Sequence, residues 1–144
     1  MPDAVARYRA RISGPLLDRI DLHVDVPALP AADLSGAAHG ESSKTVRERV
    51  AQARRRQIAR QGAANARLAG RAAEMHARAD ARANDFLRRA SASLALSARS
   101  HHRVLKVART IADLEGCARV GEDHVAEALR YRSEAAAKVE RPTG

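Results

Sequence analysis

The sequence of 144 residues is poor in the side chains that build sheets and large cores. It has one cysteine, no tryptophan, one phenylalanine and two tyrosines. Leucine, valine, isoleucine and phenylalanine together make up about 19% of the chain, just under the level at which high net charge favours disorder. The 33 alanines bury little area each, so we expect a thin helical core and exclude a β-sandwich or a β-barrel.

Two further shortages limit the location and the chemistry of the protein. No apolar stretch approaches the roughly 20 residues that span a bilayer, and the first residues lack the apolar segment of a signal peptide. We therefore expect a soluble, cytoplasmic protein with no membrane partner. The single thiol, Cys117, excludes an internal disulfide and a thiolate-rich zinc site.

Positive charge is abundant and unevenly placed. The 26 lysines and arginines exceed the 17 acidic residues, for a net charge of +9. Residues 44–71 carry most of it, with one acidic residue, Glu48, against nine cations: Lys44, Arg47, Arg49, Arg54, Arg55, Arg56, Arg60, Arg67 and Arg71. Such a segment attracts a nucleic-acid backbone or another polyanion, and a solvated helix face is the equally weighted alternative. The candidate nucleic-acid contacts are Arg54, Arg55, Arg56 and Arg60.

One segment has the alternation of a β-strand. In residues 20–26, isoleucine, leucine and valine alternate with Asp21, His23 and Asp25. No other segment alternates comparably, yet a strand needs neighbours to satisfy its backbone groups. We therefore expect residues 1–30 to be the loosely held remnant of a truncated α/β core, ending in this strand. Residues 31–41, small and unpatterned after Pro27 and Pro30, are expected to be a linker.

Residues 42–144 are predicted to form a mainly α domain, a bundle of four to five helices. Helical patterns cover about 42–61, 82–93, 97–116 and 121–136, whereas residues 62–81 are expected to be a loop or a weak helix. The first helix has a narrow apolar edge at Val46, Val50 and Ala53. The segment 97–116 has the widest apolar arc and is expected to be central. We place Asp113 on its solvent face, spaced to pair with Arg109.

Two patterns that suggest chemistry fail on spacing. Asp21 and Asp25 would lie about 13 Å apart along a strand, too far to share an ion with His23. The segment 36–45 has alanine and serine where a phosphate-binding loop ending in Lys44-Thr45 needs glycines. No nucleophile arrangement is evident either, so we predict neither a metal site nor a nucleotide loop in this chain.

Two arginines are placed to reach an anion. Arg19 follows a short turn led by Pro15 and stands at the entrance to the predicted strand. Arg99 falls in the first turn of the predicted central helix, where free backbone N–H groups and the helix dipole favour negative charge. Composition alone makes each a surface arginine more often than not.

Two long motifs carry a family resemblance. Residues 12–24, ISGPLLDRIDLHV, and residues 96–116, LSARSHHRVLKVARTIADLEG, resemble the magnesium-chelatase-like AAA+ proteins of the ComM/YifB type. Residues 124–132, HVAEALRYR, are similar to that family's closing helix. The resemblance implies that residues 42–144 are the helical lid of a ring-forming AAA+ ATPase whose core carries the Walker motifs. A departure stands at His101, where the family has tyrosine.

The resemblance also implies roles for the two arginines. Arg19 corresponds to the arginine finger, which reaches the γ-phosphate of ATP on the adjacent subunit, and Arg99 corresponds to the second sensor of the nucleotide. ATP and Mg²⁺ are the implied cofactors of the full-length protein, and none is expected on this chain alone. The implied partners are other copies of the protein in a hexamer, and DNA.

The implied activity is a DNA helicase or branch-migration motor in natural transformation and recombination, with this fragment alone not hydrolysing ATP. A chelatase-type ATPase that remodels a metal-insertion partner is one alternative. A stand-alone basic helical module that binds nucleic acid is the other.

Overall fold

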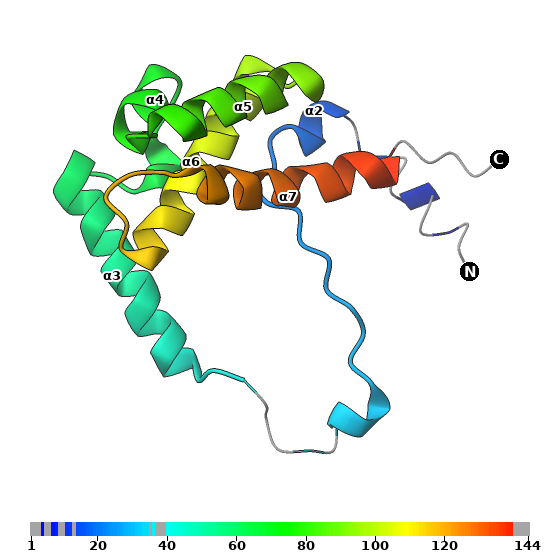
Figure 1. The fold of residues 1–144 in the computed structure, drawn as a ribbon. Helices are drawn as coiled ribbons and strands as arrows, with labels where there is room; N and C mark the ends of the chain where they lie inside the picture. The colour runs from blue at the N-terminus through cyan, green and yellow to red at the C-terminus, as the bar shows by residue number, and fades with distance from the viewer. Residues whose placement is uncertain are drawn as a thin grey trace.

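The computed structural model describes residue 4, residues 7–8, 11–12, 14–34 and 36, and residues 40–139, with the side chains of residues 32 and 133–139 outside the described part. Its elements, in chain order, are α2 (Gly14–Leu17), η1 (Ala31–Leu34), α3 (Ser43–Gln61), η2 (Asn65–Arg67), α4 (Arg71–Ala77), α5 (Ala81–Ser93), α6 (Ala98–Glu115) and α7 (Glu122–Val139) (Figure 1). The predicted mainly helical class is confirmed. None of the described helices combines the length and apolarity that a bilayer crossing requires.

Capping residues set the helix boundaries. The side chains of Ser42, Asp80 and Ser97 each accept a hydrogen bond from a backbone N–H in the first turn of α3, α5 and α6. Gly62 and Gly116 adopt left-handed conformations, with φ of 72° and 77°, and end α3 and α6. The helices predicted over 42–61, 82–93 and 97–116 are therefore confirmed, and α7 begins as predicted but continues to Val139.

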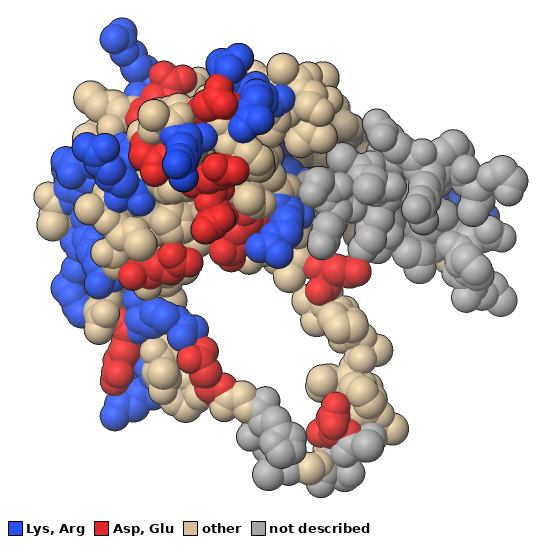
Figure 2. All heavy atoms as spheres, viewed as in Figure 1, with Lys and Arg blue, Asp and Glu red and all other residues tan. Residues whose placement is uncertain are grey.

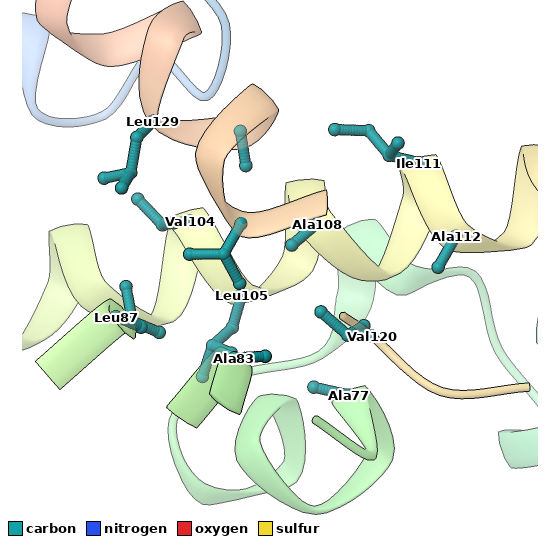
Figure 3. Close-up of a cluster of buried hydrophobic side chains, with 12 residues drawn as sticks. Ala77, Ala83, Leu87, Val104, Leu105, Ala108, Ile111, Ala112, Val120 and Leu129 are labelled. Carbon is teal, nitrogen blue, oxygen red and sulfur yellow. The ribbon is translucent and has the colours of Figure 1, made fainter. Parts of the chain in front are cut away.

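Helix α6 lies at the centre of the bundle and contacts α3, η2, α4 and α7. Figure 3 shows side chains of α4, α5, α6 and α7 meeting in one apolar cluster. Its buried members are Ala77, Ala83, Leu87, Val104, Leu105, Ala108, Ile111, Ala112, Val120, Val125, Ala128 and Leu129. The valines at 120 and 125 are both fully buried and join the start of α7 to the core, in the spacing of a hydrophobic staple.

Residues 62–81, predicted as a loop or a weak helix, contain η2 and the short helix α4. Leu68, Ala73 and Ala77 of this segment are buried, whereas Met75 is exposed. Alanine is small enough to let α4 approach α6 closely, so the segment packs despite its lack of large apolar groups. An isolated parallel bridge between Ala79 and Val120 joins its end to the α6–α7 connection.

The prediction of a strand over 20–26 is wrong for the structure that is described. These residues have no strand partner within the described part of the chain. The side chains of Asp21 and His23 face the helical body and are half-buried, whereas Ile20, Leu22 and Val24 are exposed. A ladder of backbone hydrogen bonds needs a second strand. The alternating pattern of residues 20–26 is typical of a strand within a sheet, and the described residues contain no second strand.

The apolar edge predicted for α3 is also only partly correct. Ala53 is buried as expected, and Gln57 beside it is buried too, but Val46 and Val50 are exposed. Figure 1 shows the reason, because the N-terminal half of α3 extends beyond the other helices. The valines of that half consequently have no helix to pack against among the described residues.

The thin core predicts a strong dependence on its few large side chains. We expect Leu87→Ala, at a position with 1% exposure, to lower the free energy of unfolding by about 2–4 kcal/mol, because the cavity is only partly refilled. The matched control is Leu94→Ala at the exposed end of α5, which should change stability by less than about 0.5 kcal/mol. Urea denaturation followed by circular dichroism measures both, and equal losses would contradict the assignment of the core.

Candidate functional site

A buried carboxylate organises the polar interior of the bundle. Asp113, near the end of α6, has a side chain with 1% exposure. Arg60 of α3 binds it through two nitrogens, with Nη1–Oδ1 of 2.7 Å and Nη2–Oδ2 of 2.9 Å, and Arg109 contacts Oδ1 at 3.0 Å. Asn65 donates its Nδ2–H to Oδ2 at 2.9 Å, and its backbone N–H to Gln57 at 3.0 Å. Groups from α3, η2 and α6 therefore meet at one carboxylate.

Arg109 extends this cluster to α4 and to the connection that follows α6. Its guanidinium donates to three backbone carbonyls: Ala77 at 3.1 Å, Ala118 at 3.0 Å and Cys117 at 2.6 Å. Burial lowers the pKa of Arg109, and the charge of Asp113 opposes that shift. The predicted ion pair of Arg109 and Asp113 is thus confirmed. The predicted position of Asp113 on a solvent face of α6 is wrong, because neighbouring elements cover this face.

The pKa of Asp113 lies below its usual range. Burial alone would raise it, but hydrogen bonds from Arg60 and Asn65, together with the charges of Arg109 and Arg60, outweigh burial. The carboxylate is therefore ionised at neutral pH. Sequence reasoning missed this cluster because an arginine 53 residues away supplies the main contact, and nothing in the local pattern distinguishes Arg60 from its exposed neighbours.

The four candidate nucleic-acid contacts separate into two groups. The Arg60 side chain has 9% exposure and is occupied by Asp113. Arg56 is exposed but donates Nη1–H to the carbonyl of Asp113 at 2.8 Å. Arg54 and Arg55 are exposed and form no hydrogen bond or ion pair with any residue that the structure describes. Only these last two are fully available to an outside anion.

The wider cationic segment keeps most of its charge free. Arg49 pairs with the exposed Glu41 at 2.8 Å. Helical geometry places Arg47 and Arg54, seven residues apart, along one row of α3, with Lys44 and Arg55 along a second. Figure 2 shows cationic side chains along the α3 edge of the molecule. The result is a one-sided basic surface on an exposed helix.

Arg19 lies in the turn that follows α2. The backbone N–H groups of Asp18 and Arg19 bond back to Gly14 and Leu16, which closes the turn. The Arg19 side chain is exposed, and its guanidinium contacts no hydrogen-bond or ion-pair partner in the described ranges. The acidic neighbours of Arg19 behave differently: Asp21 pairs with Arg103 of α6, and Asp18 lies 3.6 Å from Arg132 of α7.

Arg99 occupies the first turn of α6, two residues after the capping Ser97. It is exposed and forms no hydrogen bond or ion pair with the part of the chain that is described. The next residue, Ser100, is buried and its hydroxyl contacts Asp18 at 3.5 Å. The structure therefore brings the Arg19 turn against the helix start that carries Arg99, while neither guanidinium group has a partner within the described ranges.

One cluster has donor atoms suited to a metal. The ligand atoms of Glu115, Cys117 and His124 lie within 4.8 Å of one another. However, Nδ1 of His124 accepts the backbone N–H of Gly121 at 2.9 Å, so Nε2 carries the proton and donates to Glu115 at 2.8 Å. Both ring nitrogens of His124 are thus occupied, and neither has a lone pair free for an ion. A metal-binding histidine keeps one nitrogen for the metal and donates from the other. We therefore assign this cluster to capping the start of α7.

Two protein-family models together match most of the chain. Residues 40–132 match the family model described as magnesium chelatase, subunit ChlI C-terminal, and residues 1–34 match that of magnesium chelatase, subunit ChlI. The chain is 44% identical to the competence protein ComM of Haemophilus influenzae over 133 residues, and 44% identical to the uncharacterized protein YifB of Salmonella typhimurium over 136 residues. Each alignment covers 92% of this chain and 26% of the relative, so the chain spans about a quarter of their length.

The lowered pKa of Asp113 predicts acid sensitivity of the fold. Its ionised form stabilises the protein above the carboxyl pKa of the unfolded chain, and this stability is lost as pH falls through the lower pKa of the folded state. We expect Asp113→Asn to cost about 3–5 kcal/mol at neutral pH, because two buried arginines lose their counter-charge. The loss should shrink as pH decreases.

The matched control is Asp85→Asn, which removes an exposed carboxylate that pairs with Arg88 and Arg89 on α5. This variant should have nearly the stability of the parent protein at neutral pH. Urea titrations between neutral and acid pH measure both effects. An Asp113→Asn penalty that is equally small, or that is constant with pH, would contradict the account of the buried carboxylate.

Proposed function

Because the chain belongs to the magnesium-chelatase-like family of ComM and YifB, we propose that it is the C-terminal lid region of a ring-forming AAA+ ATPase. Three observations support the proposal. The bundle from α3 to α7 matches the C-terminal family model, the extended segment before it matches the preceding one, and the relatives are about four times as long. The observation that carries most weight is that the Arg19 guanidinium has no partner among the described residues, in a turn whose acidic neighbours are both engaged elsewhere.

In this proposal Arg19 is the arginine finger. A planar guanidinium with unoccupied donors suits the equatorial oxygens of a phosphoryl group, where negative charge is stabilised during transfer. Arg99 is the second sensor, because an exposed arginine in the first turn of α6 adds its charge to the helix dipole. ATP with Mg²⁺ is the proposed nucleotide of the full-length protein, bound by its core and contacted by these two residues.

The proposed work of the ATPase is DNA helicase or branch-migration activity in the cytoplasm, as a ring of identical subunits. A relative that is 44% identical bears the name competence protein, and the exposed cations of α3 supply a surface suited to a phosphate backbone. Arg54 and Arg55 are the proposed contacts. Arg56 and Arg60 are left out of this surface because Asp113 occupies them wholly or in part.

A second candidate is a chelatase-type ATPase that remodels a protein partner. The names of both matching family models favour it. The two candidates differ in what stimulates ATP hydrolysis, which is DNA for the first and a protein partner for the second. A stand-alone basic module would instead bind DNA with no stimulated ATP hydrolysis of either kind.

The arginine-finger role is tested in the full-length ATPase. We expect Arg19→Ala to lower DNA-stimulated hydrolysis by about a thousandfold or more while ATP remains bound, because the finger acts on charge that develops during transfer. Mixing Arg19→Ala subunits with subunits that bind no ATP should restore hydrolysis, since the second kind supplies an intact Arg19 to a neighbour. An unchanged rate in the Arg19→Ala protein would refute the role.

The DNA-binding role of α3 is tested on the 144-residue chain. Neutralising two phosphate contacts with Arg54→Gln and Arg55→Gln should reduce the slope of log affinity against log salt by about 1.8 for duplex DNA. The control replaces Arg88 and Arg89 of α5 by glutamine, which removes the same charge from another exposed helix. Fluorescence anisotropy at several salt concentrations measures the slopes, and equal slopes for the two double variants would show that α3 is only a solvated face.

A further inference from the structure

Both carboxylates that flank Arg19 are engaged by arginines of the helical bundle. We infer that Arg103 and Arg132 are positioning residues that hold the Arg19 turn against α6 and α7 and keep its guanidinium free for a phosphoryl group. The inference rests on the proposed function of Arg19. The contacts themselves join segments that are more than 80 residues apart in the chain.

Arg103 holds the C-terminal side of the turn. Its side chain is largely buried, with 18% exposure. A single nitrogen, Nη1, donates both to the backbone carbonyl of Arg19 and to the carboxylate of Asp21. The first contact fixes the peptide that carries the candidate finger, and the second neutralises the nearest acidic group that follows it.

Arg132 holds the other side. Its side chain has 11% exposure, and burial lowers its pKa while the charge of Asp18 opposes the shift. Nη2 donates to the hydroxyl of Ser100 at 3.0 Å and lies 3.6 Å from Oδ1 of Asp18, while Nη1 donates to the carbonyl of Ile20 at 3.4 Å. The arginines of α6 and α7 therefore hold the turn in two ways, through its backbone carbonyls and through its two carboxylates.

Arg19 has an acidic residue close to it on each side in the sequence. Asp18 adjoins Arg19 and Asp21 follows two residues later, so either carboxylate is near enough in the chain to compete for its guanidinium. Because Arg132 and Arg103 neutralise these carboxylates, Arg19 remains without an ion pair in the described part of the chain. Its donors are then available to an anion from another molecule.

The same contacts join the two candidate phosphate-binding arginines. Ser100, next to Arg99, contacts both Asp18 and Arg132. At the far end of the segment, the backbone N–H and Nδ1–H of His23 both bond to the carbonyl of Tyr131, at 3.0 and 3.2 Å. A movement of α6 and α7 with the nucleotide state would thus move Arg19 with Arg99.

The test compares Arg103→Gln with Arg103→Gln/Asp21→Asn in the full-length ATPase. We expect Arg103→Gln to lower kcat for ATP by about a hundredfold, as a small displacement of a catalytic group does, with KM little changed. Removing the released carboxylate as well should recover at least tenfold of that loss. A purely structural contact would show no such recovery, because the second substitution removes one more bonding group. Arg130→Gln, an exposed neighbour on α7, is the matched control.

Hydrogen exchange on the 144-residue chain supplies the second readout. In Arg103→Gln and Arg132→Gln the amide of His23 should exchange at least tenfold faster, while the amides of α6 keep their protection. If α6 also loses protection, Arg103→Lys supplies the deciding comparison. It retains a positive donor for the Arg19 carbonyl and the Asp21 carboxylate, so its kcat should exceed that of Arg103→Gln by at least tenfold, and a loss as large as that of Arg103→Gln would overturn the inference.

The outcomes separate the two claims. An unchanged rate in Arg19→Ala would overturn the proposed function and this inference with it. A large loss in Arg19→Ala alongside a normal kcat in Arg103→Gln would overturn the inference alone, as would an unchanged exchange rate at His23 or a double variant no faster than the single one.

Discussion

The carboxylate of Asp113, buried at the end of α6, is the group on which the arrangement of the bundle depends. It binds Arg60 of α3, Asn65 of η2 and Arg109 of its own helix. A lone charge in this interior would be strongly unfavourable, and the paired hydrogen bonds offset that cost. With a core built largely from alanine, apolar packing alone specifies helix positions weakly, so we interpret the polar cluster as the feature that sets where α3 and α4 lie against α6.

The helix that carries this carboxylate also carries the proposed functional surface at its other end. Helix α6 has 18 residues and is about 27 Å long. Its last turns are held by the Asp113 cluster and by the carbonyl contacts of Arg109, and its first turns present Arg99 and receive the Arg19 turn. A rigid helix anchored at one end is a suitable support for groups that must meet phosphate oxygens accurately.

Much of the fold could be predicted because its signals are local. Ser42, Ser97 and Gly116 mark helix ends through contacts within a few residues, and α3 begins and α6 begins and ends almost where these residues indicate. The exposed positions of Arg19 and Arg99 also agree with their local motifs. Their roles remain proposals, as does the division of the chain at residues 30 and 41.

What could not be predicted depends on distant groups. Arg60 and the exposed Arg55 look alike in the sequence, and only the fold places one of them on a carboxylate 53 residues away. The same holds for Arg103, whose partner Asp21 lies 82 residues earlier. The strand expected over 20–26 failed for a related reason, since its alternation describes a sheet environment that the described residues do not contain.

The central claim is that this bundle presents Arg19 to the nucleotide of a neighbouring subunit. The most direct measurement is a structure of the full-length ring with a non-hydrolysable ATP analogue and Mg²⁺. The account predicts the Arg19 guanidinium within about 3 Å of a γ-phosphate oxygen across the subunit interface, with Asp18 and Asp21 still engaged by Arg132 and Arg103. A ring in which Arg19 pairs with either aspartate, and another arginine contacts the phosphate, would contradict it.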